Sequence, residues 1–268
     1  MSLKVGLIGC GAIGSEIARA IDREIPQMEL VALCDRNEEK AKGVFDQLTK
    51  KPRLAKLAET IEQADLVVEA ASPKVVEELV KKVIKEGKDI LVMSVGGIID
   101  HIDLLREAQS KGCRVYFPSG AIAGIDGIKA AKESKISSVT LTTSKPPLAL
   151  EGAPYILEKG IDLKKINKST LIFEGSCRQA IKAFPKNINV SATLSLAGVG
   201  IDKTMVRIIA DPSLDRNIHH ILVEGNFGKI EIKVSNIPSP TNPKTSYLAP
   251  LSAIATLKKI VSSLQVGT

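Results

Sequence analysis

The opening stretch of the chain constrains its fold more than any other. An apolar strand pattern at Leu3–Ile8 runs directly into a G-x-G-x-x-G motif, and a helical pattern follows. In this motif the first glycine makes a tight turn, the second lets the backbone approach a pyrophosphate, and the third lets helix and strand pack closely. The helix start offers free N–H groups and a positive dipole end to phosphates. The stretch therefore predicts a dinucleotide-binding loop, with contacts from Gly9, Gly11, Ala12, Ile13 and Gly14.

A glycine motif alone is weak evidence, because glycines also cluster in ordinary turns. Here a second strand pattern at Leu30–Leu33 is followed by Asp35, about twenty residues past the last glycine, where a carboxylate binds the ribose 2′-hydroxyl. That carboxylate would repel a 2′-phosphate, which favours NAD. Arg36 directly after it could accommodate the phosphate. We therefore expect NAD as the preferred cofactor, with NADP also accepted.

The hydrophobic pattern divides the chain into two parts. Strand and helix patterns alternate up to Phe117, as in a doubly wound parallel sheet. After Pro118 strand patterns follow one another, and Gly225-Asn226-Phe227-Gly228 is a hairpin signal. The predicted fold class is α/β: a Rossmann domain at 1–120, completed by a C-terminal helix within 242–268, and an α+β domain with a largely antiparallel sheet at 121–241. We expect the second domain to carry substrate binding, catalysis and dimerisation.

Composition excludes several classes of protein. The net charge is +7, but there is no Trp, and the few Phe and Tyr are scattered, so we expect no nucleic-acid partner. A basic surface that attracts small anions, or simply a solvated lysine surface, fits better. No apolar run approaches the roughly 18 residues of a membrane span, and strand-forming sequence begins at Leu3, so we expect a cytoplasmic protein away from membranes. The four cysteines lack metal-like spacing, and we predict no metal site.

The sequence contains three histidines as candidates for acid–base chemistry. His101 lies between acidic residues at a helix start, which favours a local capping or surface role. His219 and His220 lie in one strand pattern and therefore point to opposite faces of a sheet. The pattern alone leaves either of them as a catalyst or as a partly buried structural histidine.

Two loops could bind ligands. Lys186, Asn187 and Asn189 introduce a helix, whose start could hold a carboxylate or a carboxamide; simple N-capping explains the asparagines equally well. The small-residue run 119–127 begins at the end of a parallel strand, where such sheets bind ligands; otherwise it is a tight linker.

Several of these stretches together resemble the L-aspartate dehydrogenase family over essentially the whole chain. They are the glycine loop, 118–124, 184–190, Asn217-Ile218-His219 and the segment 242–246. The resemblance implies a reversible, NAD(P)-dependent oxidative deamination of L-aspartate. Iminoaspartate would form first, and would then be hydrolysed to oxaloacetate and ammonia or passed to NAD biosynthesis.

The resemblance also implies roles for single residues. His219 matches the catalytic histidine of the family, although His220 beside it departs from the family pattern. Ala123 and Asn189 match contacts to NAD near the nicotinamide. We expect hydride transfer from the substrate Cα, with His219 taking a proton from the amine or from the attacking water. Contacts to the substrate carboxylates are predicted at Ser119, Lys186 and Asn187.

Other functions remain open at this stage. The nearest alternative is another two-domain reductase of an aspartate-derived metabolite, like homoserine dehydrogenase or dihydrodipicolinate reductase. Related sugar dehydrogenases carry Glu-Lys-Pro after the fourth strand, where this chain has Met93–Gly97. A non-catalytic NAD-sensing regulator would need a DNA-reading or partner module, which we do not recognise. The sheet formed by 136–144, 204–210 and 217–235 is a candidate surface for a homodimer.

Overall fold

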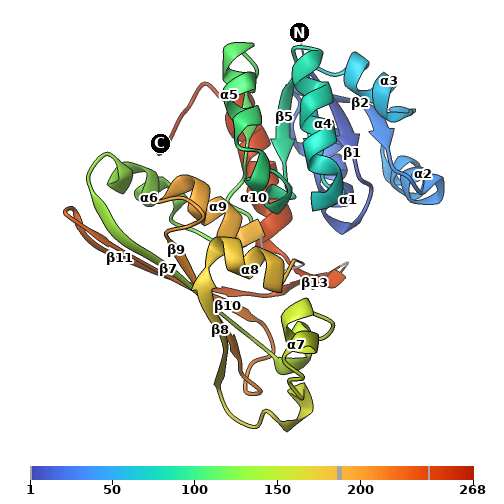
Figure 1. The fold of residues 1–268 in the computed structure, drawn as a ribbon. Coiled ribbons are helices and arrows are strands. Elements are labelled where there is room, and N and C mark those ends of the chain that lie inside the picture. The colour runs from blue at the N-terminus through green and yellow to red at the C-terminus, as the bar shows by residue number, and fades with distance from the viewer. Residues whose placement is uncertain (1, 186–188, 241) are drawn as a thin grey trace. The chain divides into compact units, whose positions relative to one another are not determined.

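The structure of the chain, a computed structural model, describes residues 2–185, 189–240 and 242–268. It divides into two compact units (Figure 1). The first unit consists of residues 1–120 and 249–265, and the second of residues 121–248 and 266–268.

The first unit contains a parallel six-stranded sheet with the strand order β3-β2-β1-β4-β5-β6. Its strands are β1 (Leu3–Ile8), β2 (Met28–Cys34), β3 (Arg53–Leu54), β4 (Leu66–Glu69), β5 (Asp89–Val92) and β6 (Val115–Tyr116). Its helices are α1 (Ala12–Glu24), α2 (Glu38–Gln47), α3 (Leu57–Gln63), α4 (Pro73–Lys85), α5 (Asp103–Ser110) and most of α10 (Leu248–Val261). The order runs outward in both directions from the β1–β4 pair, which places a switch point there. The predicted doubly wound sheet is confirmed.

Local sequence signals set the ends of these helices. The Asn37 side chain accepts the Lys40 N–H at 3.2 Å and so caps α2. Pro73 occupies the first turn of α4, where its missing N–H costs nothing. Gly87 follows that helix with φ +66°, a conformation that glycine adopts without steric cost.

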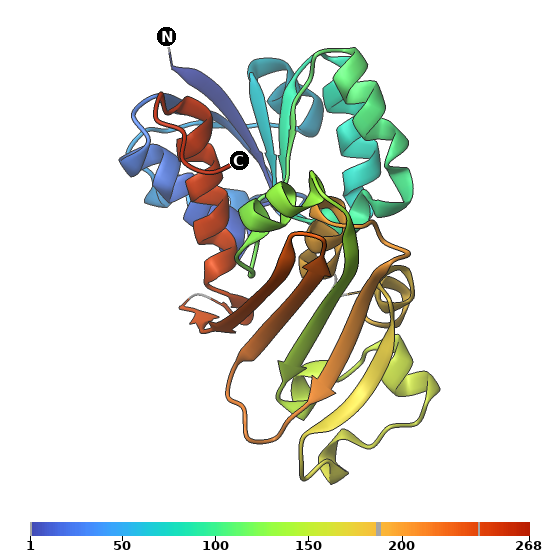
Figure 2. The same ribbon diagram turned by 90° about the vertical axis from the view of Figure 1, so that its left-hand side faces the viewer.

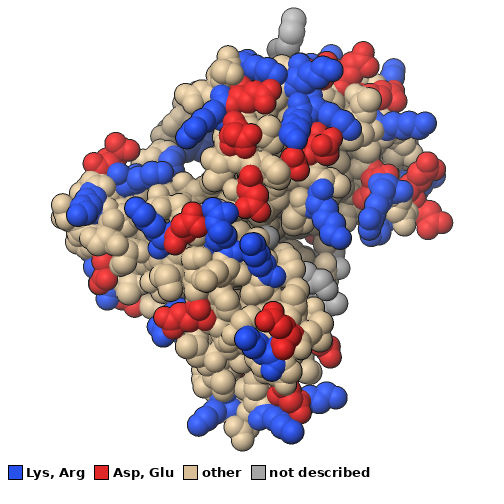
Figure 3. Space-filling view, viewed as in Figure 1, with Lys and Arg blue, Asp and Glu red and all other residues tan. Residues whose placement is uncertain are grey.

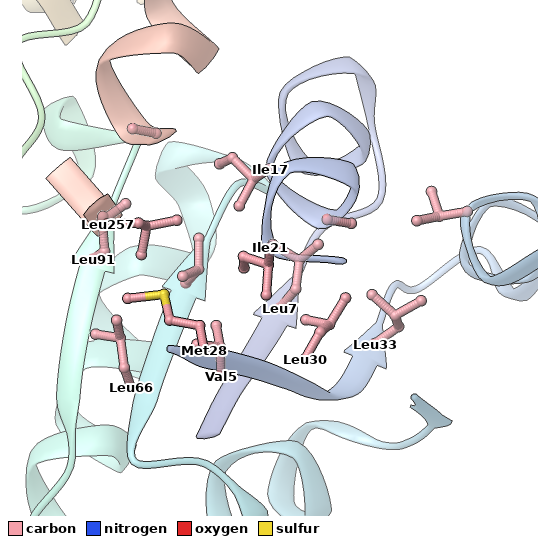
Figure 4. Close-up of a cluster of buried hydrophobic side chains, with 14 of the residues drawn as sticks. Val5, Leu7, Ile17, Ile21, Met28, Leu30, Leu33, Leu66, Leu91 and Leu257 are labelled. Atoms are coloured by element: carbon pink, nitrogen blue, oxygen red, sulfur yellow. The ribbon is translucent and has the colours of Figure 1, made fainter. Parts of the chain in front are cut away.

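The core of the first unit joins β1, α1, β4 and α10 (Figure 4). Leu7, Ile17, Leu66 and Leu257 are at most 1% exposed. Burial of each such side chain stabilises the fold by roughly 1.5–3 kcal/mol. The C-terminal helix thus completes the core of the nucleotide-binding unit.

The second unit is built on a five-stranded sheet, hereafter the mixed sheet, with the order β11-β10-β7-β9-β8. Its strands are β7 (Ile136–Lys145), β8 (Thr170–Ser176), β9 (Thr204–Ala210), β10 (Asn217–Gly225) and β11 (Gly228–Asn236). The β7–β9 pair is parallel, and the other pairings are antiparallel. The remaining helices are α6 (Ile125–Lys132), α7 (Pro154–Glu158), α8 (Cys177–Ala183) and α9 (Asn189–Ala197). The α+β character is therefore confirmed.

The two faces of the mixed sheet differ. Helices α6, α8 and α9 lie over one face (Figure 1), where Val139, Leu141, Leu194 and Ile221 form a core. The opposite face is turned toward the viewer in Figure 2 and is open over most of its strands. The open face carries Met205, with 37% of its surface exposed.

Residues 242–246 lead into the final helix, α10, as a short strand. They form β13 (Asn242–Ser246), which pairs with β12 (Pro238–Ser239) in a small antiparallel sheet. The hydrogen bonds of that pairing satisfy the backbone before α10 begins.

The face of the molecule seen in Figure 3 mixes both signs of charge. Lys and Arg side chains lie among Asp and Glu side chains instead of forming one basic strip. Within the described ranges, no helix is long and apolar enough to cross a membrane.

Candidate functional site

The glycine loop after β1 has the steric properties that the motif predicts. Gly9 has φ +98°, and a Cβ on it would lie 2.5 Å from the backbone of Ala70. A Cβ on Gly14 would lie 1.9 Å from the carbonyl oxygen of Gly9. A Cβ on Gly11 would meet nothing within 4 Å. The protein itself therefore requires Gly9 and Gly14, whereas Gly11 borders open space that a phosphate could occupy.

Asp35 connects the end of β2 to this loop. Its carboxylate accepts the Cys10 N–H at 2.7 Å and the Asn37 N–H at 2.8 Å. Each carboxylate oxygen has a second lone pair, so both can still accept a hydroxyl. The Arg36 side chain beside it is exposed. These residues fit a bound dinucleotide.

The cysteines near the loop are not reactive thiols. Burial, and then the charge of Asp35, raises the pKa of Cys10 to about 12. Burial also raises the pKa of Cys34. Because the thiolate is the reactive form, neither side chain is suited to nucleophilic chemistry.

Glu69 is a fully buried carboxylate at the end of β4. It accepts the N–H groups of Ala71 and Ser72 at 2.8 and 3.0 Å. It also accepts the N–H and hydroxyl of Ser94 at 2.9 and 2.8 Å. Burial raises the pKa of this carboxyl, and the four hydrogen bonds act against that effect. The carboxylate thus holds together the loops that follow β4 and β5, next to Gly9.

In the second unit, His219 lies on the helix-covered face of the mixed sheet and is only 5% exposed. Its Nδ1 is hydrogen-bonded to the Thr143 hydroxyl at 2.9 Å, directly across the β7–β10 pair. His220 lies on the opposite face, where its Nε2 is 2.7 Å from the Glu231 carboxylate. The structure therefore separates the two adjacent histidines: His219 is internal, and His220 forms a surface hydrogen bond with Glu231.

Lys145 lies on the same face, two residues after Thr143 on β7, and is 6% exposed. Burial lowers its pKa to about 8. Burial, and then the charge of Lys145, lowers the pKa of His219 to about 3. The imidazole is therefore neutral near pH 7 and carries a free lone pair for a proton.

A pocket of about 410 Å³, hereafter the Lys145 pocket, opens at this end of the mixed sheet. Its wall includes Lys145, Phe184, Arg216, Asn217 and Asn236. The pocket is large enough for a small amino acid, and cationic, amide and aromatic groups converge on it.

Parts of both predicted ligand-binding stretches lie in the second unit. The Asn236 side chain donates to the Ala121 carbonyl at 2.9 Å and so fixes the backbone just before Ala123, which is exposed. Asn189 is the first residue of α9 and is exposed.

The predicted substrate contacts are described only in part. Ser119 is half-buried in the first unit, beside Gly120, whose N–H donates to the Ser252 hydroxyl at 3.0 Å. Lys186 and Asn187 lie outside the described residues.

The sequence interpretation missed Lys145, Thr143 and Asn236. A signal for Lys145 was present, because it continues the alternation of Val139, Leu141 and Thr143 and so falls on the apolar face of its strand. For Asn236 the sequence offered no signal, because its contact with Ala121 is long-range. Among the described residues, no group of three His, Cys, Asp or Glu is arranged to hold a metal ion.

Comparisons with known proteins agree with this geometry. Residues 126–260 match the family described as "Aspartate dehydrogenase, C-terminal", and residues 9–118 match "Homoserine dehydrogenase, NAD binding domain". The L-aspartate dehydrogenase of Methanosarcina mazei is 56% identical, over 99% of this chain and 100% of its own. The crystal structure of aspartate dehydrogenase from Thermotoga maritima is 30% identical, with a TM-score of 0.76 and 100% of both chains covered. A homoserine dehydrogenase from Thiobacillus denitrificans is 16% identical, with a TM-score of 0.63 over 97% of this chain and 73% of its own, and shares the fold.

Proposed function

The chain belongs to the L-aspartate dehydrogenase family, and from this premise we infer how it carries out its reaction. It is an oxidoreductase that uses a pyridine nucleotide to deaminate L-aspartate. The full-length similarity to L-aspartate dehydrogenases is the observation that carries this conclusion. It disfavours the reductases of other aspartate-derived metabolites and the non-catalytic sensor.

We propose that oxidation proceeds through iminoaspartate. The Cα–H bond of L-aspartate breaks, the nitrogen lone pair forms the C=N bond, and the nitrogen loses a proton. Bound NAD(P) supplies the acceptor for the hydride. Water then adds to the C=N carbon, and collapse of the adduct releases ammonia and oxaloacetate. In the cell, the imine would instead be passed to NAD biosynthesis when an enzyme consumes it before water does.

We assign the proton transfers to His219. Its Nδ1 is bound to Thr143, which fixes the ring and leaves Nε2 as the nitrogen that exchanges the proton. The neutral state of the ring near pH 7 supports this role, because a base must begin deprotonated. Substitution by alanine should lower kcat by at least about 100-fold while the protein still binds NADH. Near-normal turnover of His219→Ala would refute the assignment.

For the cofactor, we propose that NAD is preferred over NADP and is held by the glycine loop, Asp35, Ala123 and Asn189. The support is the position of Asp35, whose carboxylate is fixed to the loop and would face a ribose 2′-substituent. Exposed Arg36 lets NADP serve as the poorer substrate. A higher kcat/KM with NADP than with NAD would show that Asp35 does not set the preference.

We further propose that Ser119, Lys186 and Asn187 contact the substrate, and that the chain works as a homodimer in the cytoplasm. The open face of the mixed sheet supports dimerisation, because it exposes apolar side chains between polar ones. The four free cysteines are typical of a reducing compartment.

The decisive experiment measures NADH formation by the purified protein with L-aspartate and with a panel of other amino acids and homoserine. We expect turnover with L-aspartate at a kcat/KM at least about 100-fold above that of any other substrate, since a buried charged contact contributes that much discrimination. Faster oxidation of homoserine would instead assign the chain to the alternative class. NADH binding without turnover of any substrate would favour the sensor.

A further inference from the structure

The Lys145 pocket contains a buried lysine to which the known reaction assigns no role. The exposed fraction of Lys145 is 6%, whereas lysine side chains are almost never fully buried. The residue ends β7 on the face that carries Thr143 and His219. Lys145 therefore lines a cavity and lies on the face of the sheet that carries the proposed base.

The other charged groups of the pocket are Glu151, Asp215 and Arg216. Arg216 donates to both oxygens of Asp215, at 2.6 and 2.9 Å, so these two charges offset each other locally. Glu151 is exposed at the end of a short helical turn, Pro147–Leu150, and water screens its charge. Lys145 is thus the buried cation of this wall.

Neutral hydrogen-bonding groups accompany it. Asn217 and Asn236 face each other across the β10–β11 pair, and both line the pocket. Asn236 already donates to the Ala121 carbonyl, which holds its amide in place. A carboxylate bound at this point would find a charged donor beside the fixed amide of Asn236 and the amide of Asn217.

We propose that Lys145 binds one carboxylate of the substrate in this pocket and thereby places the amino-bearing carbon next to His219. The proposal rests on the assignment of L-aspartate as substrate. It identifies Lys145 as the anchor of the dicarboxylate, whereas the sequence analysis predicted carboxylate contacts at Ser119, Lys186 and Asn187.

Lys145 and His219 also couple substrate binding to proton transfer. The charge of Lys145 is one of the causes that lower the pKa of His219. A carboxylate on Lys145 offsets that charge and raises the pKa of His219 toward the range in which a base is effective. The same carboxylate raises the pKa of Lys145 from about 8, so binding near this pH takes up a proton. Only a ligand with the right anionic group would therefore activate the base.

Substitution of Lys145 distinguishes a residue that anchors the substrate from one that transfers a proton. With Lys145→Met, the KM for L-aspartate should rise at least about 30-fold, with kcat within about tenfold of wild type and NADH affinity unchanged. Lys145→Arg, which keeps the charge, should recover part of the loss. Lys129→Met removes an exposed lysine of α6 as the matched control and should leave KM unchanged. A fall in kcat at unchanged KM would overturn the proposal, because it would make Lys145 a proton carrier.

A binding experiment makes the test independent of turnover. Succinate, a dicarboxylate that cannot be deaminated, is titrated calorimetrically into the NADH-saturated protein at pH 8 in buffers of different ionisation enthalpy. Wild type should bind at most about half a proton with each succinate. Lys145→Met should bind succinate at least about 30-fold more weakly and without proton uptake. Equal succinate affinity in both proteins, or binding to wild type without proton uptake, would overturn the proposal. If wild type binds succinate through Lys145 but does not oxidise L-aspartate, the proposed substrate is wrong, and the pocket is still a binding site for a dicarboxylate.

Discussion

Folding of the second unit disfavours the charged forms of Lys145 and His219. Burial lowers the pKa of both, to about 8 for the lysine and about 3 for the histidine. A folded-state pKa below the unfolded one means that the unfolded chain binds more protons, which destabilises the fold as the pH falls. The protonation of Lys145 therefore costs stability already at neutral pH, whereas that of His219 does so only below about pH 6.5. Destabilising groups of this kind are common at functional sites.

Replacing Lys145 by methionine should change how the stability of the ligand-free protein depends on pH. The pKa of the lysine falls from 10.5 to about 8 on folding, so the unfolded chain binds more protons than the folded one between these values. The free energy of unfolding of wild type should therefore rise, relative to that of Lys145→Met, as the pH increases from 8 to 10. Denaturant unfolding of both proteins at pH 7, 8.5 and 10 measures this difference. A difference that stays constant over this range would contradict the lowered pKa of Lys145.

Acid should destabilise the protein partly through His219. The unfolded histidine takes up a proton near pH 6.5, whereas the folded one stays neutral down to about 3. Between these values, each unit of falling pH lowers the free energy of unfolding by up to about 1.4 kcal/mol through this residue alone. His219→Gln should lose less stability than wild type between pH 6 and pH 4, as measured by denaturant unfolding. Parallel pH profiles of the two proteins would contradict the neutral, buried imidazole.

Single-residue predictions from the sequence succeeded where the determinant is local. The Asn37 cap follows from neighbouring residues, and strand alternation already placed His219 and His220 on opposite faces. Which face is internal could not be read from the sequence, since helices distant along the chain cover it. Lys145 was overlooked because its surroundings, such as Phe184 and Asn236 in the wall of the same pocket, are distant along the chain.

At the scale of elements, long periodic segments were predicted well and short irregular ones were not. Helix α10 carries an apolar stripe that only a core can bury, so its burial follows from its pattern, although the stripe does not specify that the first unit provides this core. The parallel β7–β9 pair and the small β12–β13 sheet depend on contacts with no local signal. The fold class was therefore predictable, whereas the strand order of the mixed sheet was not.

The junction of β1, the glycine loop and α1 permits a paired test of structure against binding. Gly14→Ala should lower the free energy of unfolding by at least about 2 kcal/mol, because its Cβ would lie 1.9 Å from the Gly9 carbonyl. Gly11→Ala should keep the stability of wild type, since Gly11 has φ −77° and open space around it, yet weaken NADH binding at least about tenfold. Thermal unfolding and fluorescence titration with NADH measure the two effects. Unchanged NADH affinity of Gly11→Ala would place the pyrophosphate elsewhere.

At the scale of the whole molecule, each unit has its own core, and each matches a separate family description. Alternating strands and helices predicted the first unit because a parallel sheet needs a crossover between its strands. For the second unit only the fold class was predicted, since antiparallel strands can pair in many orders. Its open face leaves Leu171, on β8, 48% exposed and Met205, on the adjacent β9, 37% exposed. A second copy of the chain would remove these side chains from water.

A charge on the open face should separate the proposed homodimer. Sedimentation of wild type should give twice the 28.6 kDa of one chain. Met205→Glu should weaken the dimer at least about 100-fold, because the interface would have to desolvate a carboxylate in place of an apolar side chain. Leu157→Glu is the matched control, since Leu157 is a 71% exposed apolar residue on α7, and it should leave the dimer intact. If wild type sediments as a single chain, or if Met205→Glu stays dimeric at nanomolar concentration, the open face is not the interface.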